Sequence, residues 1–81
     1  MRLFVIIILA VVILFASVDI NNASVKELVT LHGVGNVKAN AIVTFRKKHC
    51  FKNIGELTLV KGIGNKTLEK NRENLIVTDC K

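Results

Sequence analysis

Two Gly-x-Gly tripeptides are the residues of this sequence best suited to bind an anion. They are Gly33-Val34-Gly35 and Gly62-Ile63-Gly64. A first glycine can end a helix in the left-handed conformation that other residues avoid, and a second, lacking Cβ, lets a ligand approach the main chain. The first amides of a helix that starts just beyond have no intrahelical partner and favour phosphate. We therefore predict a phosphate-binding corner at each tripeptide, with Val34 and Ile63 folded back into the core.

Other glycine-rich phosphate motifs do not fit these tripeptides. The dinucleotide-binding fingerprint needs a preceding strand and a third glycine three residues further on, where Lys38 and Thr67 stand. The P-loop needs Gly-Lys-Ser/Thr, whereas residues 64–67 read Gly-Asn-Lys-Thr and lack the upstream glycine. The remaining alternative is a pair of tight turns between helices with no ligand. Recurrence of the tripeptide with the same flanks favours the phosphate site.

The elements that must hold these corners follow from an internal repeat. Shifting the sequence by 29 residues aligns residues 27–36 with residues 56–65, and Glu, Leu, both glycines and Asn coincide. Three residues before each glutamate stands a helix-capping residue, Ser24 or Asn53, so each copy opens with a capping-box pattern. Each copy therefore predicts a helix, a hairpin at Gly-x-Gly and a second helix.

The pattern that predicts the second helix is stronger in the first copy than in the second. Residues 36–48 place Val37, Ala41, Ile42 and Phe45 on one side at helical spacing, while residues 65–77 are less amphipathic. No alternating strand pattern competes with this helical interpretation, and the chain contains no proline. Phe51, in the link of residues 49–53 between the copies, is expected to fill the seam between them.

An apolar run opens the chain. Residues 3–16 are all apolar, Arg2 precedes them and Ser17 follows, a pattern typical of a secretory signal peptide. An uncleaved membrane anchor is the main alternative, although the run is shorter than the roughly 20 residues of a spanning helix; a buried core helix is another. We predict a signal peptide at residues 1–16 and one small domain at residues 17–81. That domain keeps 11 of the 12 basic residues and all 6 acidic ones, a net charge of +5, which favours a polyanion, an anionic membrane or an acidic partner.

Cys50 and Cys80 both lie after the signal segment. In an oxidising compartment they could close a loop of about 30 residues, worth roughly 3–4 kcal/mol in the chain-entropy model. Two free thiols are the alternative. His49 beside Cys50 hints at a metal, but no CxxC or HxxxH spacing supports a metal site. A disulfide is the favoured prediction, and neither a metal nor a cofactor is predicted.

Residues 20–77 resemble the tandem helix-hairpin-helix domain of ComEA-type competence proteins. The resemblance rests on a combination of motifs: "NNAS" before "EL", the first "GVG", "KANAI" followed by Arg46, and then "F…EL…VKGIG". It implies an all-α fold, a tandem helix-hairpin-helix (HhH)2 domain of about four to five short helices. It also implies an exported receptor that binds double-stranded DNA during uptake in natural transformation. A signal that leads directly into the domain is similar to the Gram-negative form and favours the periplasm; an inner-membrane anchor facing outward is the alternative.

Several residues depart from this family's pattern. The family often has proline before the first hairpin and just after each, where this chain has His32, Asn36 and Asn65. Asparagine can cap the following helix, so we expect the hairpin geometry to survive. Asn71 stands at a position that is usually apolar in the family, which leaves the packing of the last helix open. The cysteine pair is not a hallmark of the family and could compensate.

Combined with the resemblance, the corners predict contact with the DNA backbone. Main-chain amides at both hairpins would face phosphates, Lys38, Lys61 and Lys66 would reach neighbouring phosphates, and a basic cluster would attract DNA over a longer range. The predicted DNA-binding residues are Gly33, Val34, Gly35, Asn36, Lys38, Lys61, Gly62, Ile63, Gly64, Asn65, Lys66, Arg46, Lys47 and Lys48. The alternative role of the cluster is a solvated helix end, and His32 is interpreted as a turn residue. Such contacts position a protein without reading sequence.

Two other classes of function remain open. An enzyme would need a paired carboxylate site or a lysine–aspartate pair, but the six acidic residues are scattered, and so small a domain leaves little room for a substrate pocket. A secreted cationic module acting on membranes or proteins would need a broad apolar face opposite a basic one. We predict no catalytic residue, with double-stranded DNA and the uptake machinery as partners, and a membrane only if residues 1–16 stay attached. A DNA-binding accessory to a nuclease or repair enzyme is the further alternative.

Overall fold

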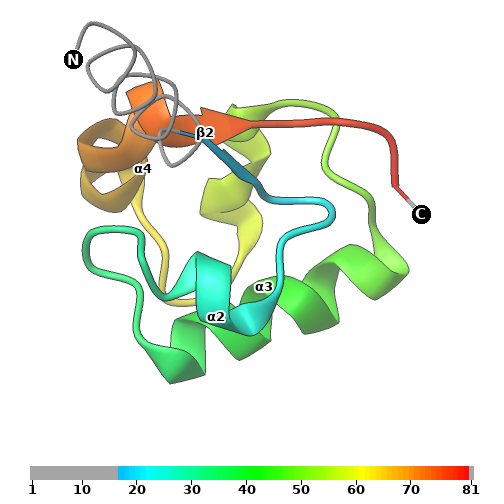
Figure 1. Cartoon of the computed structure of the whole chain (residues 1–81), viewed down its shortest axis with the longest axis horizontal. Coiled ribbons are helices and arrows are strands. Elements are labelled where there is room, and N and C mark those ends of the chain that lie inside the picture. The colour runs from blue at the N-terminus through cyan, green and yellow to red at the C-terminus, as the bar shows by residue number, and fades with distance from the viewer. Residues whose placement is uncertain (1–16, 81) are drawn as a thin grey trace, which may run out of the picture.

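Two helix–hairpin–helix units, one for each copy of the repeat, make up most of the described chain. The computed structural model describes residues 17–80, and the predicted signal peptide lies outside them. In Figure 1, helix α3 crosses the molecule from the hairpins at one end to the link at the other. The elements are β1 (Val18–Asp19), α2 (Val25–Leu28), α3 (Asn36–Lys48), the 3₁₀-helix η1 (Ile54–Leu59), α4 (Asn65–Asn71), the 3₁₀-helix η2 (Arg72–Asn74) and β2 (Leu75–Ile76). Helices α2 and α3 form the first unit, and η1 and α4 form the second. No helix within residues 17–80 has the length and apolar character needed to cross a bilayer.

The capping residues predicted for the first helix of each unit are in place, with different partners. Ser24 Oγ accepts the Glu27 N–H at 3.1 Å, and the Glu27 carboxylate accepts the Ser24 N–H at 3.2 Å, a complete capping box. In the second unit, Asn53 Oδ1 accepts the Glu56 N–H at 3.2 Å, but the Glu56 carboxylate accepts the Lys52 N–H at 2.7 Å. The second start is therefore a variant of the box, and the helix that it begins is a 3₁₀-helix.

The second helix of each unit begins at the predicted hairpin, but glycine rather than asparagine is its cap. Gly35 and Gly64 are the N-cap residues of α3 and α4, and no side chain caps either helix. Asn36 and Asn65 are the first residues inside these helices. The expectation that these asparagines cap is wrong, because each helix starts one residue too early for them to do so.

The chain after the second hairpin is less helical than predicted. Helix α4 ends at Asn71 and η2 leads into β2, so residues 65–77 do not form one helix. Strand β2 pairs in parallel with β1, with Val18 opposite Leu75 and Asp19 opposite Ile76. A strand of two residues is too short to give an alternating pattern, so the sequence does not reveal it. The fold is otherwise the predicted helical one.

Apolar residues of both units meet in one core. Val34 and Ile63, which stand between the paired glycines, are 4% and 3% exposed, which confirms that they fold back into the protein. Phe51 of the link is also buried, and its ring stacks on that of Phe45 in α3 with centroids 5.2 Å apart. Phe51 therefore fills the seam between the units, as predicted.

A disulfide and a buried amide fasten the C-terminal segment to the rest of the domain. Cys50 and Cys80 are joined by a disulfide, with their Cα atoms 6.1 Å apart. The Asn21 side chain donates to the carbonyl oxygen of Thr78 at 2.7 Å. The same side chain donates to the Phe51 carbonyl at 2.8 Å and accepts the Phe51 N–H at 2.9 Å. Asn21 thus links the beginning of the domain, the link and the C-terminal segment.

Asp19 reinforces this junction. Its carboxylate accepts hydrogen bonds from the side chains of Thr78 and Asn22. Burial alone would raise the pKa of Asp19, but these bonds, together with the main-chain N–H groups of Asn21 and Thr78, outweigh it and lower the pKa. An acid with a lowered pKa stabilises the fold while it is ionised. The contribution of Asp19 is therefore present at neutral pH and is lost as the pH falls through that lowered pKa.

Candidate nucleic-acid interface

The two Gly-x-Gly corners share one backbone conformation. Gly33 and Gly62 have φ angles of 76° and 92°, in the left-handed region that favours glycine. Gly35 and Gly64 are extended, with φ angles of −95° and −110°, and each precedes the first turn of a helix. The first glycine of each pair therefore turns the chain as predicted, and the second leads into the helix.

The first turns of α3 and α4 present unpaired main-chain N–H groups. The Ala39 N–H donates to the Gly35 carbonyl at 2.9 Å, and the Leu68 N–H donates to the Gly64 carbonyl at 3.1 Å. The amides before them, residues 36–38 and 65–67, have no acceptor among residues 17–80. Unpaired amides of this kind are the groups with which a helix start binds an anion.

The two corners lie side by side, each against the other unit. A Cβ atom placed on Gly33 would lie 3.7 Å from Thr67 Oγ1 in α4, and one placed on Gly62 would lie 3.7 Å from Lys38 Cε in α3. Lys38 and Thr67 occupy equivalent positions in the two copies, so the contact is reciprocal. Figure 1 shows the first hairpin, in green, and the second, in yellow, on the same side of the molecule. Both predicted phosphate corners thus meet at one surface.

The space beside the second glycine of each corner is open. A Cβ atom placed on Gly35 or on Gly64 would meet nothing within 4 Å. Their extended backbone is one that other residues also adopt. The fold itself therefore does not require glycine at these two positions, whereas a ligand that approaches the main chain closely would.

Three lysines predicted to contact phosphate surround the corners in different ways. Lys38 is half-buried and its Nζ donates to the Gly33 carbonyl at 3.2 Å, so its charge is held at the first corner. Lys61 and Lys66 are exposed, and neither forms an ion pair with a carboxylate of the described chain. Val37, which is 84% exposed, stands at the position equivalent to Lys66. The first corner therefore presents an apolar side chain where the second presents a cation.

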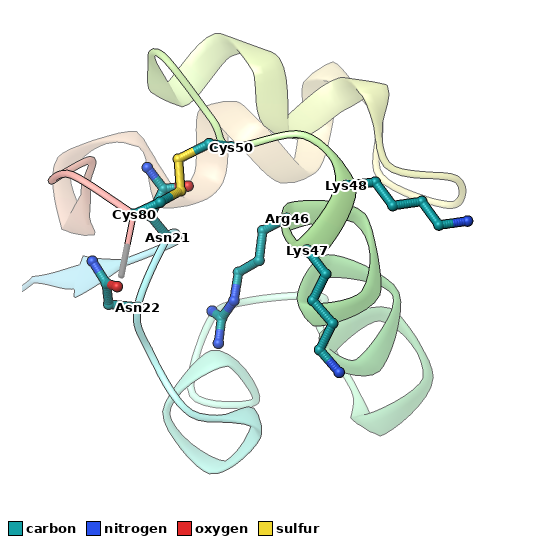
Figure 2. A pocket seen from close by; sticks show the side chains of 7 residues that line it. All are labelled: Asn21, Asn22, Arg46, Lys47, Lys48, Cys50 and Cys80. Atoms are coloured by element: carbon teal, nitrogen blue, oxygen red, sulfur yellow. A yellow bond between two sulfur atoms is a disulfide. The ribbon is translucent and has the colours of Figure 1, made fainter.

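The structure does not bring the predicted basic cluster to the corners. Arg46, Lys47 and Lys48, here called the far cluster, occupy the last turn of α3, at the opposite end of that helix from Gly35. They border a cleft beside the disulfide (Figure 2), and Lys48 also lines a mostly apolar groove along α3 with Val37 and Lys61. Arg46 Nη1 donates to the Ile20 carbonyl at 3.2 Å. The predicted DNA-binding residues thus divide into a corner group and the far cluster.

A buried asparagine fixes the first corner. Asn71 of α4 is 1% exposed. Its side chain accepts the His32 N–H at 2.8 Å and donates to the carbonyl oxygens of His32 at 2.9 Å and Thr67 at 2.8 Å. His32 is thus a turn residue whose main chain, just before Gly33, is held by the second unit. We call this pair of contacts between Asn71 and the His32 main chain the clamp. Its one signal in the sequence is a polar residue at a position that is usually apolar in the family that the chain resembles.

Replacing Asn71 with leucine should lower the free energy of unfolding by about 2–3 kcal/mol, because both main-chain groups of His32 lose their partner. Urea denaturation followed by circular dichroism measures the change. Asn74→Leu, at an exposed position of η2, is the matched control and should stay within about 0.5 kcal/mol of wild type. Equal stability of the two variants would contradict the clamp.

The chemistry that this surface offers is anion binding through N–H and ammonium groups. Glu69 of α4 pairs with Arg72 at 2.7 Å, and the hydrogen bond from Arg72, with its charge, lowers the pKa of Glu69. Among residues 17–80 no three histidine, cysteine or acidic side chains gather as metal ligands would. Phe51 is buried and Phe45 half-buried against it, so neither ring offers a stacking platform.

The chain matches a family profile described as the helix-hairpin-helix motif over residues 15–76. It is 48% identical over 60 residues to an uncharacterized protein of Haemophilus influenzae, covering 72% of this chain and 54% of that protein. It is 41% identical over 63 residues to the ComE operon protein 1 of Bacillus subtilis, covering 76% of this chain and 31% of that protein. The chain thus spans about half the length of the first relative and about a third of the second.

Proposed function

Because this chain belongs to the helix-hairpin-helix family, we propose that its two corners bind the backbone phosphates of double-stranded DNA without regard to sequence. One observation carries the proposal: unpaired first-turn amides stand beside open space at Gly35 and at Gly64, on one surface. A phosphate oxygen at each corner would accept hydrogen bonds from residues 36–38 or 65–67 in place of water. The missing Cβ atoms would let the sugar–phosphate chain come close enough for that contact.

The side chains around the corners support backbone contact rather than base reading. Lys61 and Lys66 are exposed cations that would lie beside neighbouring phosphates, and Lys38 would add its charge at the first corner. Val37, largely exposed, would lie against a deoxyribose. Contacts to phosphate and sugar set the position of a protein on a duplex and carry no sequence information.

A duplex suits this surface better than a single strand. Single-strand binding usually relies on exposed aromatic rings on which bases stack, and the chain has no tryptophan or tyrosine. Two corners side by side would instead engage two backbone phosphates of one double helix. We therefore propose duplex DNA as the preferred ligand.

The role that we propose is that of an exported DNA receptor for uptake in natural transformation, located in the periplasm and acting with the uptake machinery. The apolar run at residues 3–16 supports export, and an uncleaved segment would instead anchor the domain to the inner membrane facing outward. Similarity to a protein named for the ComE operon supports the connection with competence. Fractionation of cells into cytoplasm, membrane and periplasm, combined with a transformation assay of a deletion strain, tests this role; a cytoplasmic protein would contradict it.

We propose binding without catalysis. In the described chain Glu27 and Glu56 serve helix starts, Asp19 holds the C-terminal segment, and Glu69 pairs with Arg72. These carboxylates are already engaged and do not converge on the corners. Supercoiled plasmid incubated with the protein and Mg²⁺ should therefore stay intact on an agarose gel, and nicking that follows the protein through purification would contradict the proposal.

A salt titration tests the proposed DNA contact directly. If about 4 phosphates are neutralised, log K for a random duplex should fall against log[salt] with a slope of about −3.6. Fluorescence anisotropy of a labelled duplex measures the slope, with single-stranded DNA of equal length as the control. A slope near zero, or tighter binding of the single strand, would contradict the proposal.

A further inference from the structure

A cationic cleft lies at the end of α3 that is remote from the corners. It encloses about 630 Å³ and is lined by Asn21, Asn22, Arg46, Lys47, Lys48, Cys50 and Cys80. Three of these side chains are cations and none is acidic. Figure 2 shows Arg46 extending into the space that faces Asn22, with Lys47 running downward beside it and Lys48 pointing away to the opposite side. The disulfide closes the cleft at its upper edge, so its walls are fixed covalently as well as by packing.

The cations of this cleft are not engaged by the protein's own acids. Lys47 and Lys48 are exposed, and neither forms an ion pair within residues 17–80. Arg46 keeps one nitrogen on the Ile20 carbonyl, which holds its guanidinium at the mouth of the cleft. Asp19, the acid bound to Asn22, is itself occupied by Thr78. The far cluster therefore presents concentrated positive charge that lacks a partner in the described chain.

A phosphate held at the first corner lies far from these cations. The free amides of α3 point along the helix axis, away from its C-terminal end, so a phosphate that they bind lies beyond Gly35. The far cluster begins ten residues after Asn36, the first residue of α3, and ends twelve residues after it. At a rise of about 1.5 Å per residue this separation is about 15–18 Å. The Debye length is about 10 Å or less at 0.1 M salt and above. The attraction between the far cluster and that phosphate is therefore largely screened, and we expect these cations to contribute little to binding at the corner.

Resting on the proposed function of the corners, we infer that the far cluster binds the phosphate backbone of a second duplex, so that one chain bridges two DNA segments. The spread of the cations points to an extended polyanion, because Lys48 diverges from Arg46 and Lys47 and no single small anion could contact all three. An anionic membrane is disfavoured, because the large apolar side chains exposed in the described chain, Val29, Val37, Leu59 and Ile76, do not line this cleft.

A capture assay tests the inference with the full chain in non-ionic detergent. Beads carry one duplex, a labelled second duplex is free in solution, and retention of the label measures bridging. The test variant is Lys47→Ala/Lys48→Ala, which leaves the Arg46 contact with Ile20 in place. The matched control is Lys26→Ala/Lys70→Ala, which removes two exposed cations that line neither site. The affinity of each protein for a single labelled duplex is measured in parallel by anisotropy.

We expect the test variant to lose at least about fivefold in capture while its affinity for a single duplex stays within about threefold of wild type. The control should match wild type in both measurements. Undiminished capture by the test variant, or an equal loss in the control, would overturn the inference. So would a loss of single-duplex affinity as large as the loss of capture, since the far cluster would then serve the same duplex as the corners. Phosphatidylglycerol vesicles provide the last arm: weaker vesicle binding by the test variant with capture unchanged would assign the cleft to a membrane instead. Failure of wild type to bind a single duplex at all would refute the proposed function itself.

Discussion

Duplex binding should fall by about 100-fold or more when Gly35 and Gly64 are both replaced by aspartate, while the domain keeps or slightly gains stability. An aspartate at an N-cap accepts hydrogen bonds from the first-turn amides, so it stabilises the helix and occupies the groups proposed to bind phosphate. It also places a negative charge in the proposed phosphate position. Losing a charge-assisted contact of about 1.5–3 kcal/mol at each corner lowers the affinity for the duplex by about 100-fold or more. The fold should accept both side chains, because a Cβ atom meets nothing within 4 Å at either position.

The matched control for this experiment uses the start of the first helix in each unit. Ser24→Asp/Asn53→Asp makes the same change in net charge at the N-caps of α2 and η1. Anisotropy with a random duplex measures affinity, and thermal unfolding by circular dichroism measures stability. The control should bind within about threefold of wild type, the small loss reflecting net charge alone. If the glycine variant is folded and binds as the control does, the corners are not the DNA site.

Removing the disulfide should lower the free energy of unfolding by about 3–4 kcal/mol. The bond between Cys50 and Cys80 closes a loop with a sequence separation of 30 residues, and opening it enlarges the unfolded ensemble. A domain of this size buries little surface for its length, so the loss is a large share of its stability. Urea unfolding of Cys50→Ser/Cys80→Ser measures the effect.

Urea unfolding of the wild-type protein in the presence of a thiol reductant is the companion measurement. Its free energy of unfolding should equal that of the serine variant. DNA affinity at low temperature, where the variant is still folded, should change little because the disulfide lies at the opposite end of α3 from the corners. A loss below about 1 kcal/mol in both measurements would show that packing and the contacts of Asn21, rather than the cross-link, hold the C-terminal segment.

Local signals in the sequence were sufficient to place the starts of the elements that carry the corners, although not the end of α4. The start of α3 follows from the second glycine. The apolar stripe predicted the core face of α3 only in part, because Ile42 is buried whereas Val37 is 84% exposed. Ser24 with Glu27 gave the start of α2, because a capping box is a contact between residues three apart. The burial of Val34 and Ile63 followed from their place between two glycines that only a tight turn explains.

Features that depend on residues distant in the sequence could not be predicted in this way. The pairing of β1 with β2 joins residues more than fifty positions apart, and each strand is too short for a periodic signal. Asn71 contacts the main chain of His32, 39 residues away. The sequence around Asn71 therefore shows only a polar residue where the family usually has an apolar one. Within the candidate site, the sequence predicted which residues form each corner but not that the corners adjoin. The position of the far cluster likewise depends on the direction in which α3 leaves the hairpin.

Because the corners contact each other, the smallest fragment that can form the first corner must contain both copies of the repeat. The turn that carries Gly33 is held by Asn71 and flanked by Thr67, both contributed from the other half of the repeat. A truncated chain that stops after the link would keep every residue of the first tripeptide yet lose the scaffold that shapes it. The first corner therefore depends on the second copy for its shape, and we expect neither copy to form a corner when it is expressed alone.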